Sequence, residues 1–275
     1  MLWHSYIRSI SSLLQRTTCA GLMRLYVGFF MSSTCQTMAS DAPVPADLRA
    51  QMSKDFTEAR SRFDSATNYV DTAWRFGRAC FDFAEAATNK AERAEIAEQG
   101  IAVCRQAISR NPASAPAHYY LGMNLGQLAD TRRNLAALRM VKEMEREFQA
   151  AAELDDHFDY AGPERNLGLL YLQAPVITSI GSRSKARLHL RRAVELASEY
   201  PENRLALVEA FLKWGELNEA RREMKALDEH WPEARQRFAG ATWTANWRDW
   251  EKRLKAAKRR LEPASKPLES PRHGD

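Results

Sequence analysis

Apolar residues recur at intervals of three and four along most of this chain of 275 residues, which predicts helices with one buried face. Segment 201–234 shows the pattern most clearly, as two helices separated by a turn at Gly215. Glycine there favours the left-handed conformation that ends many helices, and Pro232 is expected to stop the second helix. The facing apolar positions of the two helices are Leu207, Val208, Phe211, Ala220, Met224 and Leu227.

The same arrangement recurs earlier in the chain. In residues 167–193 the corresponding positions are Leu167, Gly168, Tyr171, Ala186, Leu190 and Ala193, with Gly181 at the turn. Two further units fit residues 76–107 and 121–151, each with about ten extra residues, which predicts longer helices. A helix over 46–63 precedes these units and is expected to cap the first of them.

This spacing of small residues and turns resembles the tetratricopeptide repeat (TPR), whose period is 34 residues. Val208 departs from the repeat, because glycine or alanine is commonest at that position. The resemblance implies an all-α, TPR-like helical-hairpin solenoid over residues 41–240, with about four helix pairs plus capping helices. No catalytic residue is carried over with it, and neither a cofactor nor a metal is expected.

An insertion interrupts the third of these units. QAPVITSIGSRSKA, at 173–186, holds six residues more than the template needs between Tyr171 and Gly181. Its apolar residues could form a lid over one opening of the repeat, or the loop could fold back on its own repeat. The lid would consist of Val176, Ile177 and Ile180, and the following helix is expected to be capped by Ser182 or Ser184.

The first forty residues differ in character from the rest. LMRLYVGFFMSSTCQTMAS, at 22–40, has a charge, a short apolar run and then small residues, which is the order of a secretory leader. The start of translation could be Met23, and cleavage could follow Ala39. Cys35 lacks the bulky aliphatic residue that usually lies three places before a lipidated cysteine. These features predict export in a bacterium, to a periplasmic or membrane-associated location.

The segment 241–262 predicts a separate amphipathic helix. Trp243, Trp247, Trp250 and Leu254 form an apolar stripe, and the opposite face is basic. The helix could cap the last repeat with its charges solvated, or it could bind a membrane surface or a partner. Residues 263–275 are polar and are expected to be a disordered tail.

Composition and motifs narrow the function. The chain is basic, with a pI of about 9.1, but the excess of Lys and Arg over Asp and Glu is small. The sequence also lacks the basic face lined with aromatic residues that is typical of a nucleic-acid binder. No phosphate-binding, zinc-protease or nucleophile motif occurs, so an enzyme is not expected. Cys80 and Cys104 are expected to be buried and to pack as small apolar residues, and a disulfide between them is not assumed. The acidic run at 154–159 is expected to be a solvated loop.

In TPR arrays, the first helix of each pair lines a groove that contacts the bound partner. The resemblance implies the same role for the residues at the corresponding positions of this chain. The groove would combine aromatic walls with arginines suited to a carboxylate. Its residues would be Trp74, Arg78, Phe81, Tyr119, Met123, Arg165 and Leu169, followed by Glu209 and Lys213.

Residues 55–235 also resemble a narrower group, most strongly over 160–232. GPERNLGLLYLQAP, followed by SIGSRSKARLHLRRAVELASEYPENRLALVEAFL, is similar to the T component of tripartite ATP-independent periplasmic (TRAP) transporters. That resemblance implies a non-enzymatic protein that associates with a periplasmic solute-binding protein. Two functions are therefore expected: a scaffold for protein–protein interaction, or an accessory of solute uptake that binds a small hydrophobic or carboxylate ligand. Membrane contact would come only from the leader or a lipid anchor.

Overall fold

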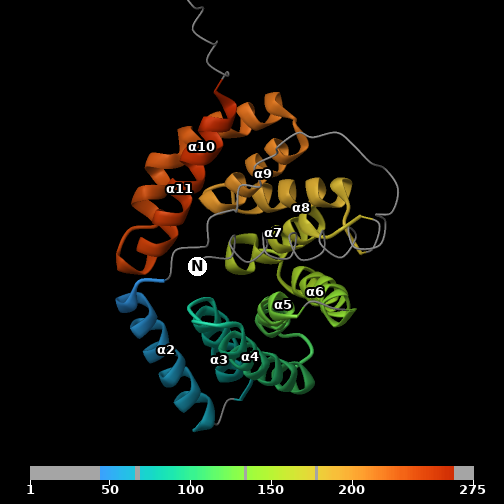
Figure 1. The fold of residues 1–275 in the computed structure, drawn as a ribbon, viewed down its shortest axis with the longest axis vertical. Helices are drawn as coiled ribbons and strands as arrows, with labels where there is room; N and C mark the ends of the chain where they lie inside the picture. Colours follow the sequence, from blue (N-terminus) through green and yellow to red (C-terminus); the bar gives the residue numbers. More distant parts are fainter. Residues whose placement is uncertain (1–43, 66–68, 133–134, 177–178, 263–275) are drawn as a thin grey trace, which may run out of the picture. The chain divides into compact units, whose positions relative to one another are not determined.

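The computed structural model describes residues 44–65, 69–132, 135–176 and 179–262, which form helices joined by turns and loops (Figure 1). No strand occurs in these residues. The chain divides after Ser198 into two compact units. The all-α class and the arrangement in consecutive helix pairs confirm the fold expected from the sequence.

The first unit holds a leading helix and three helix pairs. The leading helix is α2 (Ala46–Asp64), and it packs against α3. The pairs are α3 (Tyr69–Glu85) with α4 (Lys90–Arg110), α5 (Ala115–Thr131) with α6 (Leu135–Leu154), and α7 (Phe158–Gln173) with α8 (Arg183–Leu196). The first helices also pack on one another, α3 on α5 and α5 on α7. This packing of like helices places the side chains of three repeats on a shared surface.

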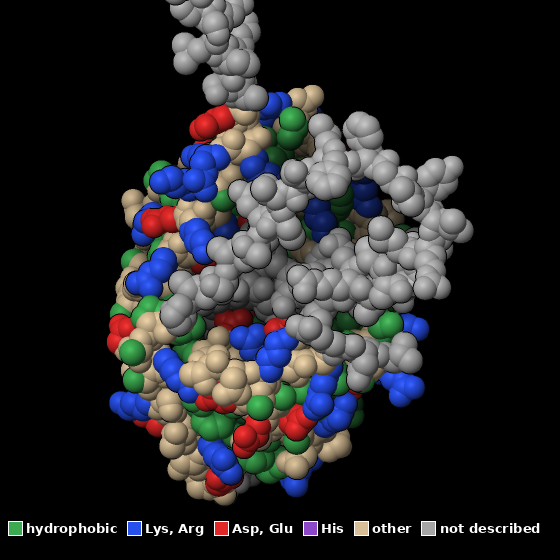
Figure 2. All heavy atoms as spheres, in the orientation of Figure 1, with side chains coloured by type: hydrophobic (Ala, Val, Ile, Leu, Met, Phe, Trp, Pro, Cys, Tyr) green, Lys and Arg blue, Asp and Glu red, His purple; other side chains and the backbone are tan. Residues whose placement is uncertain are grey.

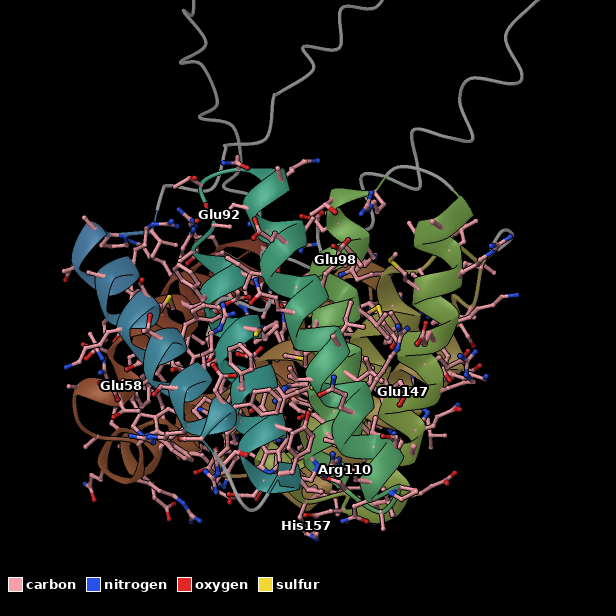
Figure 3. All side chains as sticks on the ribbon, turned by 90° about the horizontal axis from the view of Figure 1, so that it is seen from below. Glu58, Glu92, Glu98, Arg110, Glu147 and His157 are labelled. Carbon is pink, nitrogen blue, oxygen red and sulfur yellow. The ribbon has the colours of Figure 1, made fainter. Side chains whose placement is uncertain are left out.

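The start of α4 shows how local sequence sets these boundaries. The side chain of Asn89 accepts a hydrogen bond from the Glu92 amide at 2.9 Å, and the Glu92 carboxylate accepts one from the Thr88 amide at 2.7 Å. Two otherwise unpaired backbone donors are thereby satisfied. Arg49 of α2 donates to the same carboxylate at 2.6 Å, so the leading helix is attached where α4 begins (Figure 3).

The insertion after α7 closes on its own repeat. The Gly181 amide donates to the Pro175 carbonyl at 3.2 Å, and the Ser182 amide donates to the Tyr171 carbonyl at 3.1 Å. The Ser182 hydroxyl then caps α8 by accepting from the Lys185 amide at 3.3 Å. Of the predicted lid residues, Val176 is exposed and Ile180 is half-buried, while Ile177 lies outside the described residues.

The second unit consists of α9 (Pro201–Trp214), α10 (Leu217–Arg237), a short 3₁₀ turn (Ala241–Trp243) and α11 (Thr244–Leu261). Gly215 ends α9 with φ of 75°, as its position in the repeat predicts. Pro232 does not end α10, contrary to expectation, because the helix continues for five residues beyond it. Pro232 is exposed, so water can bond the carbonyl that its missing N–H leaves free.

A buried ion network joins α11 to α9. Arg253 is 4% exposed and donates to Glu202 at 2.7 and 2.8 Å, to Glu209 at 3.0 and 3.1 Å, and to Asp249 at 3.0 Å. The indole N–H of Trp250 donates to Glu202 at 2.7 Å. The apolar face predicted for 241–262 therefore meets a polar network as well as other apolar side chains.

Two further observations bear on location and redox chemistry. No helix in the described part of the chain is both long enough and apolar enough to cross a membrane. Cys80 on α3 and Cys104 on α4 are free, buried thiols, and burial raises the pKa of Cys80 to about 12. Both thiols therefore remain protonated and unreactive at neutral pH.

His118 lies between two hydrogen-bond acceptors. Its ring nitrogens face the Glu147 carboxylate at 2.7 Å and the Pro112 carbonyl at 2.9 Å, and Figure 3 shows Glu147 on α6. Both partners accept hydrogen bonds, so they favour the imidazolium and raise the pKa of His118, with Glu147 the larger cause.

A group with a raised pKa in the folded state stabilises it at low pH, and that stabilisation is lost as pH rises through the folded-state value. We therefore expect His118→Gln to cost more stability at pH 6 than at pH 8, measured by urea denaturation. Glu147→Gln should remove the same pH dependence. Equal costs at the two pH values in both variants would contradict this assignment.

Candidate binding surface on the first helices

Four aromatic rings from three consecutive repeats meet in the first unit. Trp74 comes from α3, Tyr119 and Tyr120 from α5, and Phe158 from the start of α7; we call them the Trp74 cluster. Trp74 stacks on Tyr120 with ring centroids 6.0 Å apart and planes at 6°. Phe158 stands edge-on to the other three, at centroid distances of 5.3 to 6.3 Å. Such packing fixes each ring by its neighbours.

A polar network lies beside the rings. The Tyr119 hydroxyl donates to the Asp159 carboxylate at 2.7 Å and accepts from the Asn166 amide at 3.1 Å. The Asn166 amide also lies 3.2 Å from the Met123 sulfur. Burial and the neighbouring Asp159 charge both raise the pKa of Tyr119, so its hydroxyl stays a hydrogen-bond donor.

The backbone at this network is strained. Asp159, Tyr160 and Ala161 have φ of 51°, 56° and 59° in succession, a left-handed turn made by three residues that are not glycine. Each such residue destabilises the folded state by on the order of 1 kcal/mol or more, and residues in this conformation are found most often at functional sites. Arg165 holds the turn by donating to the Tyr160 carbonyl at 3.1 Å and to the Asp159 side chain at 3.4 Å.

Gly162 follows the left-handed turn and allows the close approach of Tyr119. A β-carbon at Gly162 would lie 2.8 Å from the Tyr119 hydroxyl oxygen. Any other residue would displace the phenol from Asp159 and Asn166. The turn, the phenol and the arginine therefore form one rigid assembly on the shared surface of α5 and α7.

The residues predicted for the groove divide by exposure. Trp74 is partly exposed, and the Arg78 side chain is 47% exposed, 3.6 Å from Asp82. Five others are buried: Phe81, Tyr119, Met123, Arg165 and Leu169. Glu209, which is half-buried and pairs with Arg253, and Lys213, which is exposed, lie on α9 in the second unit. The structure brings Trp74 and Tyr119 together in the aromatic cluster, and Met123 and Arg165 into the adjoining polar network.

Sequence reasoning missed four residues of this surface: Tyr120, Phe158, Asp159 and Asn166. Asp159 lies in the acidic run that was expected to be a solvated loop, and the structure instead places its carboxylate against Tyr119 and Arg165. Asn166 precedes the small-residue position Gly168 by two places, and the signal available in the sequence was a polar residue at the edge of the apolar run 167–170.

The side chains on this surface are suited to binding another molecule. A partly exposed indole and an exposed guanidinium suit contacts with aromatic, apolar or carboxylate groups. Across the described residues, no group of histidine, cysteine, aspartate and glutamate side chains could hold a metal ion.

The comparisons with known proteins give partial matches. The family model for Regulator of microtubule dynamics protein 1-3 matches residues 47–161, which is less than half of the chain. The match runs from α2 to Ala161 and so includes the Trp74 cluster. A comparison with curated proteins finds no match.

Among solved structures, the chain is similar to a thermophilic TPR protein of Thermus thermophilus. The two are 16% identical, the alignment covers 75% of this chain and 98% of that one, and the TM-score is 0.49. None of these findings supports the resemblance of residues 55–235 to the T component of TRAP transporters.

Proposed function

We propose that this chain is a non-catalytic scaffold that binds another protein through the exposed side of the Trp74 cluster. The observation that carries the proposal is the environment of Trp74. Its indole is stacked on Tyr120 on one side and is partly exposed, and the Arg75 guanidinium lies 4.5 Å from its ring centroid. Arg75 and Arg78 are both exposed beside it. Tryptophan, tyrosine and arginine are the residues that most often dominate protein interfaces.

The rigidity of the surface supports the same function. Trp74 is fixed by Tyr120 and Phe158, and its indole N–H donates to Asp71 at 3.0 Å. A side chain that is already immobilised loses little conformational entropy when a partner binds. The turn at Asp159 adds to this rigidity through the bond from the Tyr119 hydroxyl to the Asp159 carboxylate.

The non-catalytic part of the proposal rests on the state of the reactive groups. Cys80 and Cys104 are buried thiols, and the pKa of each is raised by burial. His118 and His189 each face a glutamate, at 2.7 and 2.6 Å, with no nucleophile among the partners recorded for their ring nitrogens. Activated nucleophiles need an adjacent base and access to substrate.

The partner and the cellular location belong to the proposal as well. The leader-like residues 1–40, which lie outside the described residues, support export to a bacterial envelope and a periplasmic partner such as a solute-binding protein. The match of residues 47–161 supports a different partner, because that family is named for regulators of microtubule dynamics. Identifying the protein held at the Trp74 surface decides between them.

A photo-crosslinking experiment tests the function directly. Benzoylphenylalanine replaces Arg78 at the surface, or Lys142 on the exposed side of α6 as the matched control, in cells that make the full chain naturally. We expect one discrete protein adduct from position 78 and none of the same mass from 142. Trp74→Ala should lower the adduct yield about tenfold or more, as truncation of a central interface tryptophan does. Equal adducts at both positions, or a yield unchanged by Trp74→Ala, would contradict the proposal.

The second candidate function is a small-ligand accessory of solute uptake. The stacked rings and the nearby guanidinium groups favour it, because an aromatic wall with a few polar groups also suits a small hydrophobic or carboxylate ligand. Native mass spectrometry of the purified chain distinguishes the two functions. A bound mass of a few hundred daltons, released on denaturation and lost in Trp74→Ala, would support the ligand and not the scaffold.

A further inference from the structure

A stripe of four cations runs along α11. Arg248, Lys252, Lys255 and Arg259 follow one another at intervals of four, three and four residues, and all four are exposed. At about 3.6 residues per turn they fall within an arc of about 60° and extend over roughly 16 Å of helix. We call these four residues the α11 stripe. Figure 2 shows lysine and arginine side chains along this part of the surface.

The stripe lies opposite the buried face of the helix. Trp247, Trp250, Arg253 and Ala257 are buried where α11 packs against α9 and α10. The same rotation of about 100° per residue places the centre of these four residues on the far side of the helix from the stripe. The stripe is therefore free of the packing that holds α11 in the unit.

The two acidic side chains within α11 are engaged by other arginines. Asp249 accepts from Arg253 and Glu251 pairs with Arg235. By contrast, Lys258, one residue from the stripe, pairs with Asp228 at 2.7 Å. Within the described part of the chain, no ion pair or hydrogen bond joins a stripe side chain to an acidic residue. The four cations of the stripe thus outnumber the acidic side chain that lies beside their C-terminal end, Glu262.

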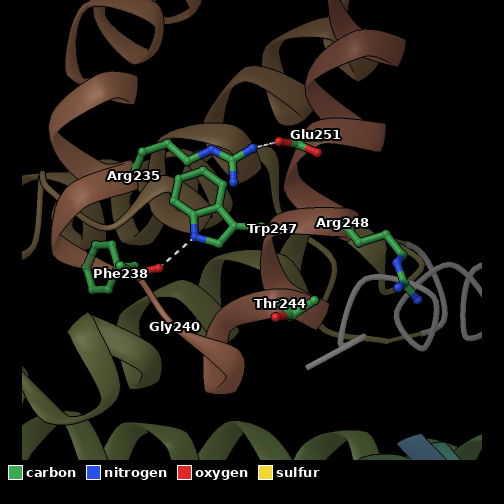
Figure 4. Close-up of a pocket in the computed structure, with 8 residues that line it drawn as sticks. Arg235, Phe238, Gly240, Thr244, Trp247, Arg248 and Glu251 are labelled. Carbon is green, nitrogen blue, oxygen red and sulfur yellow. Dashed lines mark hydrogen bonds and ion pairs between the residues drawn. The ribbon is translucent and has the colours of Figure 1, made fainter. Parts of the chain in front are cut away.

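A cleft adjoins the N-terminal end of the stripe. It has a volume of about 480 Å³, and its lining includes Arg248, Thr244 and Trp247 (Figure 4). The Arg235 guanidinium lies over the Trp247 ring, 4.2 Å from its centroid. Arg248 belongs to both the stripe and the cleft, and the cleft offers apolar contacts from Phe238 and Trp247 as well as polar ones.

These features favour an acidic polypeptide over the other polyanions. The exposed arc of α11 carries no large apolar side chain, which a helix needs to enter a membrane interface. It also carries no exposed aromatic residue on which a base could stack. In an extended peptide, alternate side chains point the same way at about 6.6 Å. The cations rise by about 4.5 to 6 Å from one to the next, within reach of their flexible side chains.

We propose that the α11 stripe docks an extended acidic segment of a partner protein, with carboxylates at alternate positions and one end of the segment over the cleft. This surface is separate from the Trp74 cluster, so the proposal does not depend on the function assigned there. Binding through exposed charges gives rapid association that weakens as salt rises.

Fluorescence anisotropy with a labelled decaglutamate peptide and the full chain tests the proposal at low salt. We expect Lys252→Glu/Lys255→Glu to weaken binding at least about tenfold, since two attractive contacts become repulsive. Lys90→Glu/Lys142→Glu is the matched control, because it changes the net charge equally at exposed positions of the first unit. The control should bind within about twofold of the wild type.

Two results would overturn the proposal. The first is an equal loss of peptide binding in both double variants, which would show a response to net charge alone. The second is binding to vesicles containing phosphatidylserine that depends on the stripe while decaglutamate does not bind, which would assign the stripe to a membrane surface.

Discussion

Replacing Arg253 with methionine destabilises the second unit by about 3–5 kcal/mol, the usual cost of leaving buried charges without their partner. Three carboxylates surround this guanidinium, and the side chains of Glu202, Glu209 and Asp249 are only 12%, 17% and 11% exposed. Without Arg253 they repel one another in a poorly solvated site. Methionine preserves most of the volume, so the expected loss reports the charge rather than a cavity.

Urea denaturation followed by tryptophan fluorescence measures the effect. Five of the seven tryptophans lie in residues 199–275, so the signal reports mainly on the second unit. Arg259→Met removes an exposed cation from the same helix and is the matched control, with an expected change within about 0.5 kcal/mol. Adding Glu202→Gln and Glu209→Gln to Arg253→Met should recover part of the loss. A loss no larger than that of Arg259→Met would refute the role given to the network.

Gly181→Ala is expected to destabilise the junction of α7 and α8 by about 1–3 kcal/mol or more, as overpacking does. A β-carbon at this position would lie 2.0 Å from the Ala174 carbonyl oxygen and 2.8 Å from the Pro175 carbonyl carbon. Both are backbone atoms, so no side-chain rotation can relieve the contact. The insertion would have to open and lose the bond from the Gly181 amide to Pro175.

Hydrogen exchange measured by mass spectrometry localises this second effect. Amides at the end of α7 and the start of α8 should exchange faster in Gly181→Ala, while those of α9 to α11 should not change. Val176→Ser, at a residue 74% exposed in the same insertion, should match the wild type. Wild-type exchange in Gly181→Ala would mean that the loop closes in some other way.

Much of the fold could be predicted because its determinants are local. A few adjacent residues decide the spacing of apolar side chains along a helix, and the same is true of the turn at Gly215 and the helix cap at Ser182. The prediction for Pro232 was wrong for the same reason: proline disfavours a helix locally, but packing around Ala234 and Phe238 and solvent at the exposed turn sustain α10.

The candidate surface could be predicted only in part. The repeat register brought Trp74, Tyr119 and Arg165 to one surface, since equivalent helices stack on one another. The turn at Asp159 could not be foreseen, because aspartate, tyrosine and alanine ordinarily adopt right-handed conformations. Its geometry is maintained by Tyr119, forty residues earlier, and by Arg165, so the cause is tertiary.

The ion network at Arg253 also sets an order of events during protein synthesis. Ribosomes make α9 and α10 before α11, so Glu202 and Glu209 emerge well ahead of the arginine that neutralises them. Until α11 arrives, these carboxylates remain charged and hydrated, which opposes burial of the α9 surface. Because α11 is made last, the second unit can bury the α9 surface only after Arg253 has emerged.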